Sequence, residues 1–290
     1  METPSAETAE PTAIPTCYRH ADRETRLSCS NCGRPVCVEC VRSAPVGQKC
    51  PECAKPAPGA TVIRGRDVVG GGLRRGAPVS FTLIAVCVAA FLLSQALPDL
   101  ILGYGAQGTQ AVLAGQWWRL ATTAFLHSTS NFLHIAFNMY ALYLFGPSLE
   151  RHVGGVAFLG LYLASAVAGG TAFVVADVLW GSGNGVVVGA SGAVFGLFGG
   201  MLAIAWRNRG SAAGQASLRS LMTMLVLNLL LGFAVPGIAW QAHLGGLAAG
   251  ALISLVWEAL PARRRRGPVL LAPVVAVLLV CAATLLLLVG

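Results

Sequence analysis

Charged side chains are scarce in this sequence. Asp, Glu, Lys and Arg make up 11% of its 290 residues, whereas hydrophobic residues make up 55%. So small a charged fraction excludes an ordinary soluble domain, because it cannot cover the surface of one. The composition instead predicts a membrane protein that crosses the bilayer several times and carries an additional segment.

The first 60 residues also lack an apolar run that could form the central region of a signal peptide. We therefore expect the amino terminus to stay in the cytosol. The formal net charge is +8, but the basic residues lie between apolar spans and in a flanking linker rather than on one folded face. They are typical of membrane topology signals, so no nucleic-acid partner is expected.

Cysteine is nearly absent outside the amino-terminal segment. Seven of the nine cysteines lie between Cys17 and Cys53, and the other two, Cys87 and Cys281, are isolated in apolar spans. With His20, the seven form four pairs, each with a two-residue gap that lets both side chains reach one tetrahedral Zn²⁺. Eight ligands suit two ions. A disulfide framework is the alternative, which a reducing cytosol disfavours.

Spacing alone leaves the grouping of these pairs open. Residues 17–55 resemble a B-box-type zinc finger, and the resemblance implies that the pairs alternate between two structural ions. One ion would then be held by Cys17, His20, Cys37 and Cys40, and the other by Cys29, Cys32, Cys50 and Cys53. Residues 1–16 are predicted to be disordered, and residues 56–78 to form a flexible linker.

Seven apolar stretches follow, each close to the ~20 residues that a helix needs to cross the hydrocarbon core. They cover residues 79–97, 132–149, 154–176, 186–206, 218–235, 238–257 and 268–289. Arginines concentrate before the first stretch and in alternate loops after it, which predicts a cytosolic amino terminus and an outer carboxyl terminus. The outer loop 98–131 shows no clear span. Its Trp117-Trp118-Arg119 is interpreted as an interfacial anchor or a gate.

Four polar side chains lie near the starts of three of these stretches. His134 and Asn138 lie in the second, Ser191 about a turn into the fourth, and His243 about a turn into the sixth. A lone Ser in a membrane helix often donates a hydrogen bond to a backbone carbonyl of its own helix or lets a neighbouring helix pack closely. A lone buried His often donates a hydrogen bond to a carbonyl. The predicted orientation, however, places all four at one depth near the outer face, and ionisable groups within membranes tend to mark function.

Together these groups could perform acyl transfer. A neutral His243 could take the proton of Ser191, which would make the hydroxyl a nucleophile. No carboxylate that could orient His243 as the third member of a catalytic triad is obvious. Glu258 lies roughly 22 Å further along the same helix, and Asp177 is expected in a loop. A dyad is therefore favoured over a triad.

Two further features support this arrangement. His134 and Asn138 share a helix face and could join the backbone N–H of Ser191 in holding an oxyanion. Small residues recur every four positions in both helices, which predicts that the fourth and sixth spans approach closely. These residues are Gly192, Gly196 and Gly200 in one span and Gly246 and Gly250 in the other.

Residues 79–260 are similar to rhomboid intramembrane serine proteases. The motifs occur in the family's order: Trp118-Arg119, His134-x-x-x-Asn138, Gly146-x-x-x-Glu150-x-x-x-Gly154, Gly189-x-Ser191-Gly192 and His243-x-x-Gly246-x-x-x-Gly250. The resemblance implies an all-α polytopic membrane fold with a six-helix core and a seventh transmembrane helix in residues 261–290. It also implies a Ser191/His243 dyad that cleaves transmembrane proteins in or near the bilayer. Many family members have a further His five residues before the one that corresponds to His134. In this sequence that position is Thr129, and His127 lies seven residues before His134.

Two other functions stay open. An inactive rhomboid relative would bind and retain membrane proteins without cutting them, although it would need neither Ser191 nor His243. A transporter or channel would also use Gly-rich helices with polar groups in the membrane. The zinc module is expected to bind a cytosolic protein partner, and no cofactor is expected for catalysis.

Overall fold

The computed structural model describes residues 14–43, 47–55, 76–235, 237–261 and 267–289. The chain divides into two compact units, an amino-terminal unit of residues 1–64 and a helical unit of residues 65–290. Most of the predicted disordered segment, most of the predicted linker and the arginines at 263–266 lie outside the described residues.

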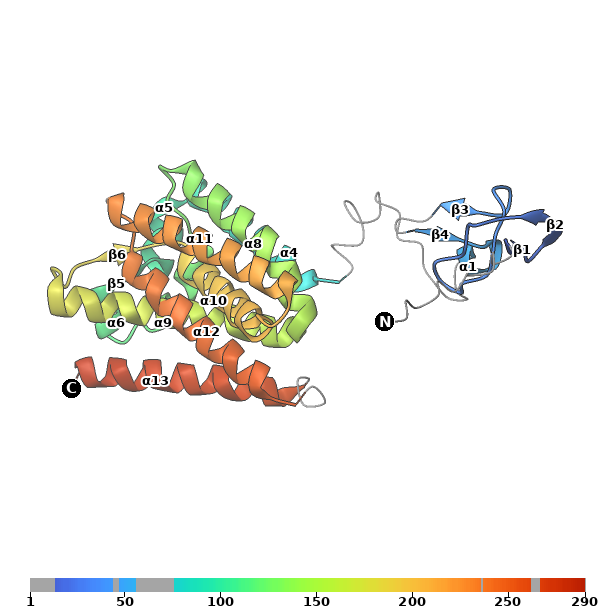
Figure 1. The fold of residues 1–290 in the computed structure, drawn as a ribbon. Helices are drawn as coiled ribbons and strands as arrows, with labels where there is room; N and C mark the ends of the chain where they lie inside the picture. The colour runs from blue at the N-terminus through green and yellow to red at the C-terminus, as the bar shows by residue number, and fades with distance from the viewer. Residues whose placement is uncertain (1–13, 44–46, 56–75, 236, 262–266, 290) are drawn as a thin grey trace, which may run out of the picture. The chain divides into compact units, whose positions relative to one another are not determined.

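Where it is described, the amino-terminal unit is built from short strands and one turn of helix (Figure 1). Strand β1 (Thr16–Cys17) pairs antiparallel with β2 (His20–Glu24), and β3 (Arg42–Ser43) pairs with β4 (Gln48–Lys49). Helix α1 (Pro51–Ala54) follows β4. The buried cluster of this unit consists of six side chains, Cys17, Cys29, Val36, Cys37, Cys40 and Cys50. Because five of the six are cysteines, the unit has little ordinary hydrophobic core of its own.

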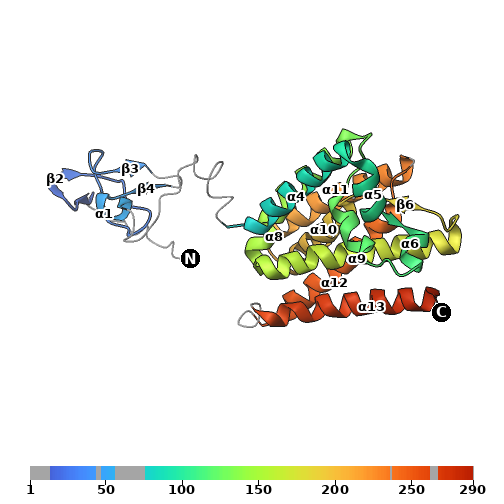
Figure 2. The ribbon, with the colours of Figure 1, turned by 180° about the vertical axis from the view of Figure 1, so that it is seen from behind.

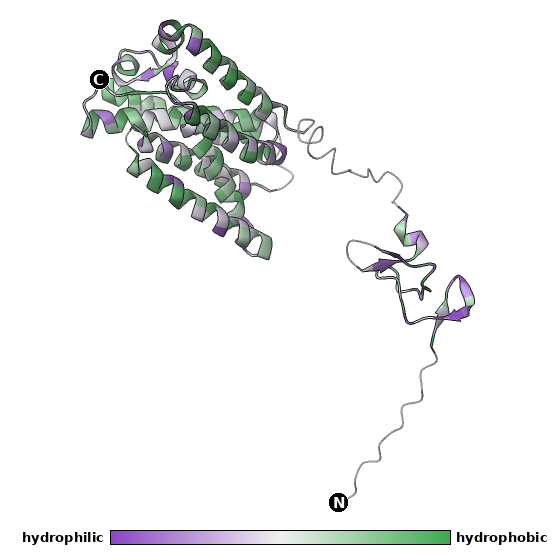
Figure 3. Ribbon diagram, turned by 90° about the horizontal axis from the view of Figure 1, so that it is seen from above, coloured by the Kyte–Doolittle hydropathy of each residue, from purple (hydrophilic) through white to green (hydrophobic). Residues whose placement is uncertain are grey.

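Within its described residues, the helical unit has seven long helices (Figures 1 and 2). They are α4 (Pro78–Ala96), α8 (Phe132–Val153), α9 (Gly155–Trp180), α10 (Ser191–Arg207), α11 (Ala212–Ala234), α12 (Trp240–Ala259) and α13 (Leu271–Val289), the last preceded by the 3₁₀ turn η3 (Pro268–Leu270). The hydropathy colouring of Figure 3 shows these helices as largely hydrophobic, in contrast to the strands of the amino-terminal unit.

Five segments within the described residues are long and apolar enough to cross a membrane, namely α4, α9, α11, α12 and the continuous Pro268–Val289. Helix α10 is apolar but has only 17 residues. Helix α8 carries Glu150, Arg151 and His152 near its end. The protein is thus a multi-pass, all-α membrane protein, and the predicted fold class is confirmed.

The segment between α4 and α8, which we call the outer segment after its predicted side of the membrane, contains no long helix but is folded into short elements. It contains α5 (Pro98–Gly105), β5 (Gln107–Gly108), α6 (Thr109–Leu113), α7 (Arg119–Thr122) and the 3₁₀ turn η1 (Thr123–Phe125). Arg119 holds this segment together, because its guanidinium donates to the carbonyls of Ala106 at 2.6 Å and Gly103 at 2.8 Å. The elements were missed because each is too short to show a clear periodicity.

The predicted fourth span also begins later than expected. Val186–Val187 forms strand β6, which pairs antiparallel with β5 of the outer segment. Gly189 has φ +139°, a conformation outside the helical region that glycine adopts readily. Helix α10 therefore starts at Ser191, so this residue is the first of its helix rather than a turn inside it. Helix α11 conversely starts six residues before the predicted 218.

A buried carboxylate anchors the first long helix. Glu150 of α8 is 2% exposed and accepts hydrogen bonds from the backbone N–H groups of Val79 (2.9 Å) and Ser80 (2.7 Å). The hydroxyl of Ser80 donates to the same carboxylate at 2.7 Å. The first N–H groups of a helix have no partner within it, and a negative charge at this end is favourable. Glu150 therefore caps α4 from a neighbouring helix.

Helix α10 lies at the centre of the unit, in contact with α8, α9, α11 and α12 (Figure 1). Its contact with α12 is made through glycines: a Cβ on Gly246 would collide with the carbonyl of Gly192, and one on Gly250 with that of Gly196. The predicted close approach of these two helices is confirmed. By contrast, α11 buries only Gly214, Leu221 and Gly232.

We expect Gly250→Ala to lower the free energy of unfolding by about 1–3 kcal/mol, the usual cost of overpacking a tight contact. Thermal unfolding in detergent measures the change. Gly103→Ala is the matched control, because a Cβ there meets no atom within 4 Å. Equal unfolding midpoints for the two variants would contradict this account of the α10–α12 contact.

Candidate active site

Ser191 directly follows a short non-helical stretch that the outer segment holds in place. We call residues 185–189 of this stretch the serine turn. The backbone N–H of Gly189 donates to the carbonyl of Thr123 at 3.1 Å, and the Thr123 hydroxyl donates to the carbonyl of Val187 at 2.9 Å. Both bonds join η1 to the residues that precede Ser191. The serine then opens α10, where the backbone N–H groups of the first turn have no partner in their own helix.

His243 lies in the first turn of α12 and is 8% exposed. Its Nε2 is 2.9 Å from Ser191 Oγ, a normal hydrogen-bond distance. The glycine contact between α10 and α12 makes this distance possible, because a short Ser side chain and an imidazole must meet across two helices. The structure thus brings together the two groups that the sequence singled out from different spans.

The imidazole of His243 also lies flat against Phe195, one turn after Ser191 on α10. The ring centroids are 4.2 Å apart and the planes differ by 8°. Sequence reasoning gave Phe195 no role, although its position four residues after Ser191 places it on the same helix face. The stack fixes the plane of the imidazole and so helps to orient Nε2.

Among the residues that the structure describes, no carboxylate is bonded to the other ring nitrogen of His243. Nδ1 is buried and has no hydrogen-bond partner among the described residues. Glu258 lies in the last turn of α12 and contacts His152 Nε2 of α8 at 2.7 Å. Asp177, expected in a loop, belongs to α9, where it accepts from Thr109 Oγ1 at 2.6 Å and from the N–H of Gly185 at 2.7 Å. Both acids are therefore engaged elsewhere.

His134 lies beside the serine turn. A Cβ built on Gly189 would lie 2.6 Å from His134 Nε2 and 3.7 Å from Ser191 Oγ, so both side chains border the same glycine. Asn138, one turn further along α8, is buried and donates from Nδ2 to the carbonyl of His134 at 2.8 Å. One amide hydrogen of Asn138 is used in that bond, which leaves the second for another acceptor.

A third histidine, His127, contacts the ring of His134. His127 is fully buried, and the centroid of its ring is 5.3 Å from that of His134 in an edge-to-face contact. The carbonyl of Thr129 accepts a hydrogen bond from Gln95 Nε2 at 3.1 Å. The contact between His127 and His134 was not foreseen, because it depends on how the outer segment folds back onto α8.

The fold and this arrangement define a multi-pass α-helical membrane protein in which a serine at a helix start is hydrogen-bonded to a histidine on the adjacent helix. A family model described as Rhomboid domain matches residues 114–259. The chain belongs to the rhomboid family.

Individual relatives agree with this assignment. The putative rhomboid protease YdcA of Bacillus subtilis (strain 168) is 38% identical over 159 residues, which cover 54% of this chain and 74% of that protein. Rhomboid protease GluP of the same organism is 35% identical over 156 residues, 52% of this chain and 28% of that protein. Rhomboid protease AarA of Providencia stuartii is 31% identical over 183 residues, 56% of this chain and 63% of that protein.

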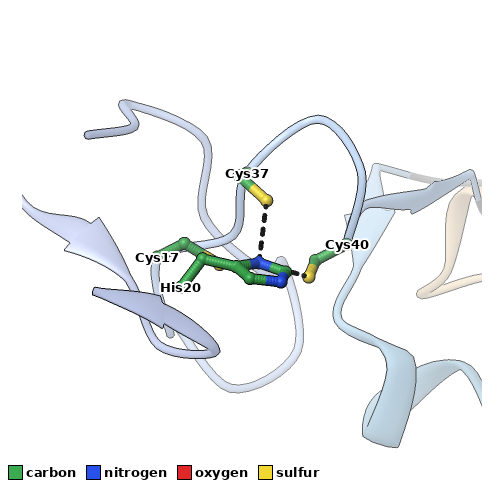
Figure 4. Close-up of side chains that lie close together, drawn as sticks. All are labelled: Cys17, His20, Cys37 and Cys40. Carbon is green, nitrogen blue, oxygen red and sulfur yellow. Dashed lines mark hydrogen bonds between the residues drawn. The ribbon is translucent and has the colours of Figure 1, made fainter. Parts of the chain in front are cut away.

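The amino-terminal unit brings its eight sulfur and nitrogen donors together in two groups, each with its ligand atoms within 4.8 Å of one another. One group is Cys17, His20, Cys37 and Cys40, and the other is Cys29, Cys32, Cys50 and Cys53. These are the same two sets that the B-box resemblance implied. In the first group, His20 Nδ1 lies 3.4 Å from the sulfurs of both Cys37 and Cys40 (Figure 4).

Two thiols of the second group are shifted toward the thiolate, the form of cysteine that binds metal, whereas burial raises the pKa of Cys50 to about 11. A hydrogen bond from the backbone N–H of Cys50 lowers the pKa of Cys29 to about 6. Arg34 donates from Nε to the sulfur of Cys32 at 3.3 Å and thereby lowers the pKa of that thiol. Four donors per group with nitrogen and sulfur ligands fit tetrahedral Zn²⁺ and leave no open position for a substrate.

We expect the purified full-length protein to contain two zinc ions per chain, and Cys37→Ser to reduce this number because it removes a ligand from one group. Elemental analysis after dialysis measures the zinc content. Cys281→Ser, which changes a cysteine of α13, is the control and should retain both ions. Zinc absent from the unaltered protein would contradict the assignment.

Proposed function

We propose that the protein is an intramembrane serine endopeptidase in which Ser191 is the nucleophile and His243 the general base. The observation that carries the proposal is the distance of 2.9 Å between Ser191 Oγ and His243 Nε2. Proteolysis is also supported by the names of the relatives, YdcA, GluP and AarA, which are all described as rhomboid proteases.

The proposed reaction uses the neutral form of His243. As Oγ attacks the scissile carbonyl carbon, Nε2 accepts the hydroxyl proton and a tetrahedral oxyanion forms. His243 then gives this proton to the leaving amine, the C–N bond breaks and an ester to Ser191 remains. A water molecule attacks this ester, again with His243 as base, and releases the new carboxyl group and the free serine.

The oxyanion needs donors that are in place before the reaction. The backbone N–H of Ser191 is available because α10 begins there. His134 borders the same glycine as Ser191, and Asn138 has one amide hydrogen left after its bond to the carbonyl of His134. We assign these two side chains as further donors. Loss of one such donor typically costs about 3 kcal/mol of transition-state stabilisation.

The proposed substrates are transmembrane proteins whose helices are weakened by Gly or Pro. In the bilayer, the peptide groups of an intact helix are shielded by their own hydrogen bonds. A segment that unwinds readily can present its carbonyl to Ser191. We place the cut near the outer end of the substrate helix, since Ser191, His243 and His134 all lie in the first turns of α10, α12 and α8.

The two competing functions, an inactive rhomboid relative and a transporter, differ from a protease in how the protein should respond to serine-directed reagents such as a fluorophosphonate. An inactive relative would bind membrane proteins without reacting with a fluorophosphonate, and a transporter would move solutes regardless of serine-directed inhibitors. The Ser191–His243 hydrogen bond favours the protease, because neither alternative requires this pair.

We further propose that the amino-terminal unit binds a cytosolic protein or the cytosolic tail of a substrate and takes no part in cleavage. Its two closed ligand groups offer no open metal position for chemistry. If it lies in the cytosol, most of the ~30 Å hydrocarbon core separates it from the proposed active site. The Cys37→Ser protein should then still react with a fluorophosphonate at Ser191, and loss of that reaction would refute this division of roles.

Ser191→Ala and His243→Ala should each reduce cleavage of a model single-span substrate by about 10⁴-fold or more, because each removes half of the dyad. Asn138→Ala should cost less, about 10²-fold, since other oxyanion donors remain. Cleavage is measured by gel or fluorescence with purified protein in detergent. Folding is checked by thermal unfolding, and undiminished cleavage by well-folded Ser191→Ala would refute the proposal.

A reporter fused after Gly290 should appear outside the cell and one fused before Met1 in the cytosol, because the arginine-rich loops stay inside. Phosphatase and fluorescent-protein fusions, active on opposite sides of the membrane, measure the two locations. A cytosolic carboxyl terminus would mean that one of the seven long helices does not cross the bilayer.

A further inference from the structure

The last helix, α13, contacts the outer segment that holds the serine turn. Leu285, near the carboxyl end of α13, is 2% exposed. It packs in one cluster with Val112 of α6, Leu120 of α7 and Val174 of α9, and Trp117 and Leu288 pack against the same cluster. Figure 2 shows this end of α13 beside α6. The contact therefore joins α13 to the outer segment as well as to the core helix α9.

The outer segment in turn determines where the backbone before Ser191 lies. Strand β5, which directly precedes α6, pairs with β6, with Gly108 opposite Val186 and Gln107 opposite Val187. The N–H of Thr109, the first residue of α6, donates to the carbonyl of Gly185 at 2.9 Å. On the other side, Thr123 follows directly after α7 and accepts from the N–H of Gly189.

The buried cluster that contains Leu285 thus includes residues of α6 and α7. Thr109 of α6 and Thr123, directly after α7, hold residues 185–189 by hydrogen bonds. From these contacts we infer that α13 positions the serine turn through the outer segment, with Leu285 as a positioning residue. This inference rests on the proposed function and adds to it a role for the seventh helix in setting the rate of reaction at Ser191.

The physical basis is packing rather than hydrophobic attraction. In a bilayer, an apolar helix gains little by leaving lipid for protein, so its association depends on close side-chain contacts. The buried cluster around Leu285 includes Val112 of α6 and Leu120 of α7, two helices whose short length gives them little rigidity of their own. A cavity in this cluster loosens α6 and α7, and the serine turn bonded to them follows. A displacement of about 1 Å at a reacting group can cost up to 10²-fold in rate.

The experiment measures the rate of fluorophosphonate labelling of Ser191 per folded molecule, at a temperature well below the unfolding midpoint. Leu285→Ala should react about tenfold more slowly than the unaltered protein. Leu285→Met, which conserves volume, should restore the rate. Leu285→Val, a smaller truncation, should show an intermediate rate and replaces the alanine variant if that variant does not fold.

Two control variants separate positioning from general loss of stability. Val274, near the other end of α13, is 5% exposed and packs against Gly160 of α9. Val274→Ala should lower the unfolding midpoint but leave the labelling rate of the folded protein unchanged. Leu287 is 85% exposed, and Leu287→Ala should change neither quantity.

An unchanged labelling rate for Leu285→Ala would overturn the inference, and so would an equal slowing by Val274→Ala. In both cases the unaltered protein still reacts, so the proposed function stands. An unaltered protein that does not react with the fluorophosphonate at all would refute the proposed function and this inference with it.

Discussion

The site depends on how closely two helix backbones approach each other. A serine side chain is short, so its hydroxyl reaches a histidine on another helix only if no side chain separates the two backbones. In this protein, glycines remove that separation: Gly246 faces the carbonyl of Gly192, and Gly250 that of Gly196. Small residues serve this purpose in membranes, where helices associate through packing because lipid is as apolar as the protein. The hydrogen bond between Ser191 and His243 lies at one end of this contact.

Much of this arrangement could be predicted because its signals are local. Runs of apolar residues define the helices, four-residue glycine spacing defines a contact face, and two-residue gaps between cysteines define ligand pairs. The start of α10 was predicted incorrectly because Val186–Val187 is apolar, like a membrane helix, yet it forms a strand whose partner β5 lies nearly 80 residues earlier. Sequence composition does not reveal such a distant pairing.

Contacts within the site were harder to foresee than the residues that form it. The stack of Phe195 on His243 and the contact of His127 with His134 depend on the final rotation of each helix and on the folded outer segment. Phe195 in particular looks like any other apolar residue of a membrane helix. Its role becomes visible only because His243 lacks a partner for Nδ1 among the described residues, so that ring stacking contributes to its orientation.

The small buried surface of α11 has a consequence for how this protein can diversify. Substitutions in α10 and α12 meet glycine contacts that tolerate almost no change in volume. Along α11, the buried residues are Gly214, Leu221 and Gly232, and most other side chains face outward. Mutations there cost little stability, so this helix can accumulate sequence variation while the chemistry of the neighbouring pair stays constant. Evolution can thus alter the lipid-facing surface near the site without rebuilding the site itself.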